Sequence, residues 1–157
     1  MAGEHIYYVM ALLKSWGFKN IKSRCIKDVG KDSNNYIYEV DHISIEDVAY
    51  IRKGDLFPSN EAITIYYHEK QEITIPYGTN HYRRRNYETV GDEFVDMGFS
   101  QIYERKIEDL ITGWLTKDGS VEDVLVKVGN REIKLEKGDR YAFDTPIIIT
   151  YHTFKYL

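Results

Sequence analysis

The sequence predicts an α+β protein made of two tandem copies of one small unit. Two pairs of similar stretches predict this duplication. "ITIYYHEK" at residues 63–70 returns as "IIITYHTF" at residues 147–154. "LLKSWGFKNIKSRCIKDV" at residues 12–29 aligns with "EFVDMGFSQIYERKIEDL" at residues 93–110, which lies 81 positions later. Self-similarity at a nearly constant spacing is the sequence signature of a repeated structural unit.

The two copies are expected to span residues 1–70 and 71–157. Each copy is expected to be one helix packed on a small, largely antiparallel sheet of three to four strands. A unit of about 70 residues is close to the lower limit for a self-sufficient hydrophobic core. We therefore expect the two copies to pack against each other, with a ligand groove at their junction.

Each copy is expected to begin with a helix, because apolar residues recur there at spacings of three and four. Gly17 and Gly98 end the two patterns, as glycine does at the position after many helices. Asn86 is a suitable N-cap for the second helix. The apolar positions are Ile6, Val9, Leu13 and Trp16 in the first copy and Tyr87, Val90, Phe94 and Met97 in the second.

Strands are expected to follow each helix. They are "NIKSRCI", "YIYEV", "SIEDVAYI" and "ITIYYH" in the first copy, and "QIYERKI", "GWLTK", "SVEDVLVKV" and "IIITYH" in the second. "SIEDV" at residues 44–48 aligns with "SVEDV" at residues 120–124, an offset of 76 that grows to 84 by the last strand. Eight extra residues are therefore expected in the second copy. Gly129-Asn130 lies between alternating apolar positions and predicts a tight hairpin there.

Composition and charge narrow the class of function. The net charge of −4 argues against generic binding to nucleic acid or to an anionic membrane. No apolar run approaches the roughly 18 residues that span a bilayer, so we expect no direct membrane insertion by this chain. The single cysteine, Cys25, excludes an internal disulfide and a multi-cysteine metal site. We expect neither a metal nor a cofactor.

Two repeated sets of polar residues are candidates for chemistry. Tyr67-His68 and Tyr151-His152 end equivalent strands, where a histidine could ligate a metal or transfer protons. Adjacent strand residues point to opposite faces, so tyrosine and histidine do not converge and a structural role is favoured. The repeated acids are Asp28 with Asp109 and Asp47 with Asp123. They lack the ligand spacing of a calcium loop, so turn formation is the favoured role.

Enzymatic activity is not expected. The sequence has no P-loop glycine pattern, nucleotide fingerprint or serine-hydrolase elbow. Cys25 aligns with Lys106, so it is not part of a site that the two copies share. The segment Tyr82-Arg83-Arg84-Arg85 concentrates positive charge, but acidic residues follow it closely. An anionic wall polymer or an acidic protein patch is therefore favoured over nucleic acid as its partner.

A family resemblance is carried by "ITIPY" at residues 73–77, "GWLTKDGSVE" at residues 113–122 and "ITYHTF" at residues 149–154. These stretches resemble the PASTA unit of bacterial cell-wall sensors, with its Ile-Pro lead-in, short helix, glycine turn and apolar last strand. The whole chain resembles a tandem PASTA-like domain pair of uncharacterised envelope-associated proteins from Gram-positive bacteria. It departs from the pattern at Asp144-Thr145-Pro146, where a second glycine turn is expected. The first copy lacks the Ile-Pro lead-in, which is expected of a fragment of a longer protein.

The resemblance implies a non-catalytic binding or spacer module, located outside the cytoplasm as part of a larger membrane-attached bacterial protein. Peptidoglycan fragments or another protein are the expected partners. From exposure and position alone, the ligand-binding residues are expected to be Tyr77, Tyr82, Arg83 and Arg84, near the junction of the copies. One alternative is a protein–protein interaction module that self-associates through an exposed final strand. The other, which is disfavoured, is a nucleic-acid binder that uses the arginine segment.

Overall fold

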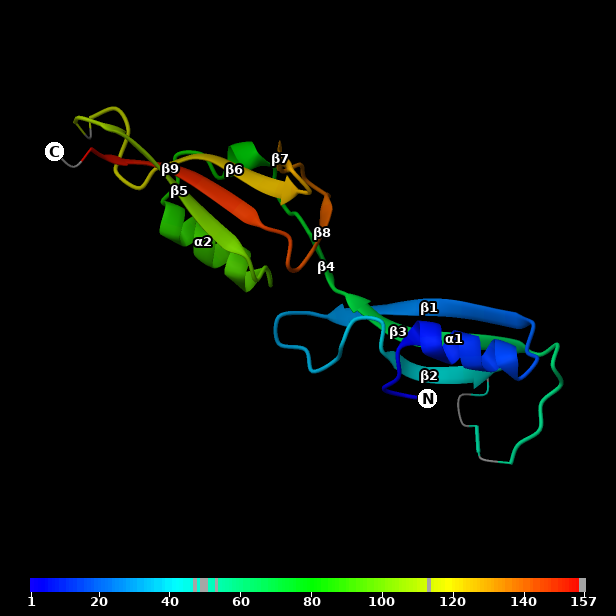
Figure 1. The fold of residues 1–157 in the computed structure, drawn as a ribbon. Helices are drawn as coiled ribbons and strands as arrows, with labels where there is room; N and C mark the ends of the chain where they lie inside the picture. The colour runs from blue at the N-terminus through cyan, green and yellow to red at the C-terminus, as the bar shows by residue number, and fades with distance from the viewer. Residues whose placement is uncertain (47, 49–50, 53, 113, 156–157) are drawn as a thin grey trace. The chain divides into compact units, whose positions relative to one another are not determined.

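The computed structural model describes residues 1–46, 48, 51–52, 54–112 and 114–155 of the chain. The chain divides into two compact units, Met1–Gln71 and Glu72–Leu157. Each unit has its own hydrophobic core and its own helix and sheet (Figure 1). They are called unit 1 and unit 2 below.

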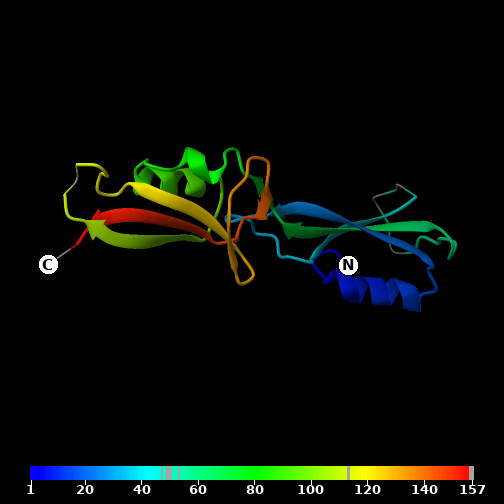
Figure 2. The ribbon, with the colours of Figure 1, turned by 90° about the horizontal axis from the view of Figure 1, so that it is seen from above.

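Unit 1 is a helix on a three-stranded sheet. Its elements are α1 (Ile6–Ser15), β1 (Asn20–Val29), β2 (Val40–Ile45) and β3 (Ala62–Lys70). The strand order is β1-β3-β2, with β3 parallel to β1 and antiparallel to β2. The helix lies along one face of this sheet (Figure 2). It buries Ile6, Val9 and Leu13 against the alternate strand residues that face it, among them Ile63 and Ile65.

Unit 2 repeats this arrangement and adds to it. Its elements are β4 (Glu72–Thr74), the 3₁₀ helix η1 (Thr79–His81), α2 (Tyr87–Asp96), β5 (Ile102–Leu110), β6 (Val121–Val128), β7 (Arg131–Lys134), β8 (Arg140–Ala142) and β9 (Ile147–Phe154). The main sheet has the order β5-β9-β6-β7, and β4 pairs with β8 in a separate ribbon. The expected tight hairpin is present, since β6 and β7 are joined by Gly129-Asn130 and pair from Val128 to Arg131.

The structure confirms the predicted α+β class, with one helix on a small sheet in each unit. Both main sheets are mixed, because β1 pairs with β3 in parallel in unit 1 and β5 pairs with β9 in parallel in unit 2. The last strand of each unit, β3 or β9, is therefore flanked by a strand on both sides. The hypothesis of self-association through an exposed final strand is wrong, because neither β3 nor β9 offers a free edge.

The strand registers correct the predicted alignment of the two copies. Ile43 pairs with Ile65 in unit 1, as Val124 pairs with Ile149 in unit 2. The offset is thus still 81 in the second strand of each unit, so "VDHI" is equivalent to "VEDV" and the alignment of "SIEDV" with "SVEDV" was wrong. Only three residues, not eight, are inserted before the last strand, where the offset is 84. Asp47, which that alignment matched with Asp123, lies outside the described residues.

Two of the expected strands are wrong, and a third, "SIEDVAYI" at residues 44–51, overlaps β2 only at Ser44 and Ile45 and falls partly outside the described residues. Residues 36–39 of "YIYEV" form a turn in which Tyr38 has a positive φ of 66°. The described residues of "GWLTK", 114–117, form a loop in which Leu115 is 98% exposed. Both stretches have the aromatic and β-branched composition of strands. The Tyr38 N–H donates to the His68 carbonyl at 2.8 Å and the His68 N–H donates to the Glu39 carbonyl at 2.9 Å, but the positive φ of Tyr38 turns the chain out of an extended strand. Composition alone does not decide, since strand preference depends on its surroundings.

The helix ends follow the sequence closely. The Asn86 side chain accepts hydrogen bonds from the backbone N–H groups of Glu88 and Thr89, at 2.9 and 3.2 Å, as an N-cap does. In α1 the corresponding cap is His5, which is not one of the usual N-cap residue types. Trp16 also differs from expectation, because it lies at the C-cap of α1 and is 56% exposed.

Two glycines of unit 2 are expected to respond in opposite directions to alanine. Gly98 has a φ of 104°, and its added Cβ would lie 3.5 Å from Ile73 Cδ1. Gly98→Ala is therefore expected to destabilise unit 2 by about 1–2 kcal/mol through the backbone alone. Gly91 lies inside α2, where an added Cβ would make only an ordinary 3.8 Å contact with Ile149 Cδ1. Gly91→Ala is therefore expected to stabilise unit 2 by about 0.5–1 kcal/mol. Urea denaturation of both variants tests this, and a loss of stability in Gly91→Ala would contradict it.

Candidate functional site

A histidine and two carboxylates meet at the same place in both units. His68 and His152 occupy equivalent positions on the central strands β3 and β9, on the face that alternates away from the helix. In unit 2, both carboxylate oxygens of Asp109 lie 2.9 Å from His152 Nδ1. Glu122 Oε2 lies 3.1 Å from His152 Nε2, on the other side of the ring. These three residues are called the unit 2 histidine cluster.

The unit 1 histidine cluster consists of Asp28, Asp41 and His68. The carboxylate oxygens of Asp28 lie 2.8 and 3.0 Å from His68 Nδ1. The Oδ1 atom of Asp41 is 3.7 Å from His68 Nε2, which is an ion-pair distance but too long for a hydrogen bond. Asp41 instead contacts His42 Nδ1 at 2.5 Å, and Asn35 donates a hydrogen bond to Asp28. The second contact of the ring is therefore weaker than in unit 2.

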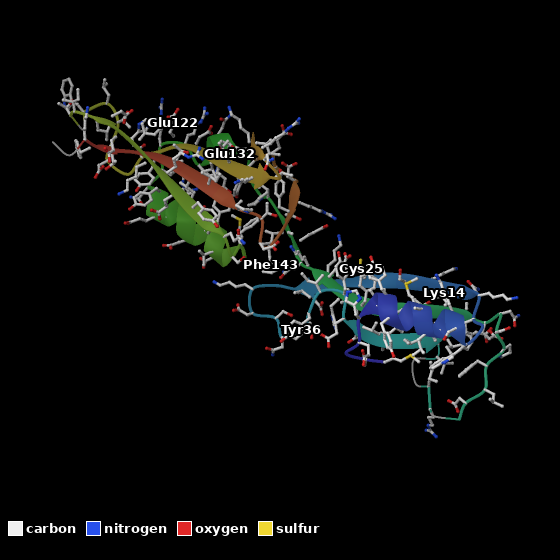
Figure 3. All side chains as sticks on the ribbon, in the orientation of Figure 1. Lys14, Cys25, Tyr36, Glu122, Glu132 and Phe143 are labelled. Atoms are coloured by element: carbon white, nitrogen blue, oxygen red, sulfur yellow. The ribbon has the colours of Figure 1, made fainter. Side chains whose placement is uncertain are left out.

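β-Bulges position all four carboxylates. The register of β1 shifts between Lys27 and Val29, and that of β5 shifts between Glu108 and Leu110. Asp28 and Asp109 are the extra residues of these two bulges. Asp41 of β2 and Glu122 of β6 are in turn the extra residues of the bulges on the other side. Because a bulge redirects the side chain of its extra residue, each histidine receives one carboxylate from each neighbouring strand (Glu122 is labelled in Figure 3).

The cluster geometry argues against a shared metal ion. The two carboxylates contact opposite nitrogens of one imidazole ring. A cation bound between one carboxylate and its nitrogen therefore lies out of reach of the other carboxylate. Within the part of the chain that the structure describes, no group of three or more His, Cys, Asp or Glu side chains could hold a metal. Cys25 is exposed on β1 and forms no disulfide (Figure 3).

Each half of this arrangement is visible in the sequence, as the repeated pairs Asp28 with Asp109 and His68 with His152, but the contact between the two pairs was not predicted. Asp41 and Glu122 were not predicted either, because the incorrect alignment of the second strand set them five positions apart. The common offset of 81 for both acids, and of 84 for the histidines, is the signal that could have shown it.

One of the four expected ligand-binding residues lies in the core. Tyr82 is fully buried, with its ring 5.1 Å from that of Phe94. Burial raises the pKa of its hydroxyl. Tyr82 is therefore not exposed to a ligand, because its ring is packed in the hydrophobic core of unit 2. The same ring anchors the segment that follows η1.

The other three expected residues lie on the surface of unit 2. Tyr77 is 48% exposed and stacks on His81, with ring centroids 4.0 Å apart and planes inclined by 16°. Arg83 Nη2 lies 3.4 Å from Asp123 Oδ1. Arg84 is exposed, has a φ of 64° and donates its backbone N–H to the Val121 carbonyl at 2.8 Å.

The stacked Tyr77 and His81 rings stand on a rigid turn. The Thr79 hydroxyl donates to the Val124 carbonyl at 2.7 Å and accepts from the Leu135 N–H at 2.9 Å. Both bonds are buried, so they hold η1 firmly against β6 and the residue after β7. A hollow of about 410 Å³ adjoins the turn, lined by Gly78, Thr79, Asn80, Lys134, Leu135, Glu136 and Lys137. The stacked rings and this hollow are called the turn platform.

The arginine segment does not form a continuous basic patch. Arg85 makes a two-point ion pair with Glu93, and its guanidinium lies 5.8 Å from the centre of the Tyr82 ring. The hydrogen bond to Glu93 raises the pKa of Arg85, so its charge is permanent but already neutralised. Of the three arginines, only Arg83 and Arg84 are exposed to a ligand.

Two solved structures of Ser/Thr kinase regions from Staphylococcus aureus are similar to the chain. The chain is similar to the entire extracellular region of the Ser/Thr kinase PrkC from Staphylococcus aureus, at 10% sequence identity and a TM-score of 0.42, over 96% of this chain and 45% of that chain. It is also similar to the three-PASTA-domain of a Ser/Thr kinase from Staphylococcus aureus, at 10% identity and a TM-score of 0.43, over 98% of this chain and 64% of that chain. The chain thus spans less than two thirds of the length of either structure.

No protein-family model and no curated protein matches the sequence. Among the described residues, no helix has the length and apolar composition of a membrane span.

Proposed function

We propose that the chain is a non-catalytic, PASTA-like binding module of a bacterial envelope protein, and that unit 2 binds peptidoglycan fragments at the turn platform. The observation that carries this proposal is the exposed, stacked Tyr77–His81 pair on a turn fixed by buried hydrogen bonds. Aromatic faces stack on the apolar faces of sugar rings, and a preorganised platform loses little entropy on binding.

Charge beside the platform suits an anionic ligand. Lys134 and Lys137 line the hollow of the turn platform, together with one acidic residue, Glu136. Peptidoglycan fragments combine sugar rings with the carboxylates of their peptide stems, which lysine attracts as a point charge. Arg83 and Arg84 remain part of the proposal as additional contacts for those carboxylates. A protein outside the cytoplasm, held to the membrane by other segments, would meet this ligand directly.

Removal of the Tyr77 ring is expected to weaken binding of soluble muropeptides by roughly three- to tenfold, the range for one aromatic stack. The measurement is an amide-shift NMR titration of the full chain. Tyr103→Ala is the matched control, because Tyr103 is an equally exposed tyrosine on β5, at 55% exposure against 48%. Equal losses in the two variants, or no saturable shifts near residues 77–84, would contradict the proposal.

An interaction with another protein is the second candidate. The loop between β5 and β6 exposes Ile111, Trp114 and Leu115, each at least 90% accessible. Exposed apolar side chains grouped in one short segment are typical of a surface that binds a partner. Chemical-shift changes confined to this loop, rather than to the turn platform, would favour this function.

A further inference from the structure

The β5–β6 loop is held at its two ends by one residue, His152. Its described part comprises residues 111–112 and 114–120. The Gly119 N–H donates to the His152 carbonyl at 2.8 Å, and the His152 N–H donates to the Ser120 carbonyl at 2.9 Å. The side chain of the same histidine contacts Asp109, just before the loop, and Glu122, just after it. The backbone and the side chain of His152 thus contact the chain at both ends of the loop.

The protonation state of the ring decides whether both side-chain contacts can form. Neutral imidazole has one N–H donor, whereas imidazolium has two. Both ring nitrogens of His152 lie within hydrogen-bond distance of a carboxylate, and an ionised carboxylate only accepts. In the neutral ring, one nitrogen lone pair would face a carboxylate. The two contacts are satisfied together only when the ring carries both protons.

We propose that the unit 2 histidine cluster is a proton-operated clasp, which holds the β5–β6 loop closed when His152 is protonated and loosens it when the proton leaves. Loss of the contacts with Asp109 and Glu122 would free both ends of the segment that exposes Ile111, Trp114 and Leu115. The loop is therefore a pH-responsive element of the surface, separate from the turn platform.

The charged surroundings of His152 are simple. Asp109 faces it from β5 and Glu122 from β6, and both are about half exposed, at 47% and 56% of their side-chain surface. On its own strand, the neighbours on the same face are the uncharged Thr150 and Phe154. Asp123, the next residue of β6, is paired with Arg83.

The direction of the pH response follows from these contacts. Burial lowers the pKa of His152, but hydrogen bonds and charge from Asp109 and Glu122 raise it more, so the net pKa lies above the ordinary value of 6.5. A raised pKa in the folded state means that the clasp contributes its full stability below pH 6.5. This contribution disappears as the pH rises through the higher folded value. The loop is expected to loosen on the alkaline side.

Unit 1 supplies an internal control. The Nε2 atom of His68 is 3.7 Å from Asp41, beyond hydrogen-bond distance, and Asp41 is in contact with His42. A neutral His68 satisfies its one short contact by donating from Nδ1 to Asp28. The unit 1 cluster needs no second ring proton, so its strands are not held by the same device.

The test is amide hydrogen exchange of the full chain at pH 6 and pH 9, expressed as protection factors that correct for the pH dependence of intrinsic exchange. The protection of the Gly119 and His152 amides is expected to fall severalfold at pH 9, while imidazole ¹⁵N shifts show two protonated nitrogens on His152 at pH 6. Glu122→Gln is expected to abolish the fall, because its amide can donate to a neutral ring. His68→Gln is the matched control and is expected to retain the fall. Unchanged protection in the native chain, or an undiminished fall in Glu122→Gln, would overturn the proposal.

Discussion

Replacement of Thr79 by valine is expected to reduce the free energy of unfolding of unit 2 by about 2–4 kcal/mol. Valine has almost the same shape, so no cavity forms, but the hydroxyl that joins η1 to two other segments is lost. The Val124 carbonyl and the Leu135 N–H would remain buried without their partner. Each buried polar group left unpaired costs about 1–3 kcal/mol.

The measurement is urea denaturation, followed by the NMR signals of unit 2. Thr89→Val, at an exposed threonine on α2, is the matched control and is expected to change stability by less than about 0.5 kcal/mol. If the turn platform is the ligand site, Thr79→Val is also expected to weaken muropeptide binding, because Tyr77 and His81 are then no longer held in place. A Thr79→Val chain as stable as the control would show that the hydroxyl contacts are not formed.

Truncation of Phe94 to alanine is expected to cost about 3–5 kcal/mol of the stability of unit 2. Phe94 is fully buried, and its ring lies 5.1 Å from that of Tyr82 and 5.9 Å from that of Phe99. The loss combines the transfer free energy of a large ring with an unfilled cavity at the centre of three aromatic residues. The same denaturation measurement checks it.

Val95→Ala is the control for Phe94→Ala. Val95 is the next residue of α2, but it is 43% exposed and is not among the buried residues of the helix. Its truncation is expected to change the free energy of unfolding by less than about 0.5 kcal/mol. Similar losses for the two variants would mean that α2 does not pack through the face described.

The helices could be predicted because their signals are local. The N-cap at Asn86, the glycines at positions 17 and 98 and the apolar spacing between them each act within a few residues. The first and last strands were also correct, since long β-rich stretches recur there in both copies. Local signals failed at Tyr38, which contacts β3 from a turn with a positive φ, and at Leu115, which lies in an exposed loop.

The histidine clusters could not be predicted from local pattern, because their members come together through strand pairing. Asp28 and His68 are 40 residues apart, and Asp109 and His152 are 43 apart. Each pair meets only because the first strand lies parallel to the last and a bulge turns the carboxylate toward the ring. Parallel pairing of the first and last strands leaves no signature at the ends of either strand.

Tyr82 shows the converse limit. A tyrosine beside three arginines suggests an exposed surface, yet its ring fills the core between η1 and α2 while the flanking Arg83 and Arg84 remain outside. Alternation of buried and exposed residues within one short connector is decided by packing against elements far away in sequence. The position of Tyr77 on the surface could be proposed from its place near Pro76, but its stacking on His81 depends on the turn that Thr79 fixes.

The central position of the last strand has a consequence for how each unit is made. Residues 102–110 of β5 pair with residues 147–154 of β9. Since β9 follows the other strands of the unit 2 sheet in sequence but lies between two of them, the middle of this sheet is synthesised after its edges. Until then, β5 and β6 have no common partner, and their apolar faces stay unpaired in the nascent chain. Contacts this distant in sequence slow folding, and synthesis that stops before residue 147 would leave two separate sheet edges open to aggregation.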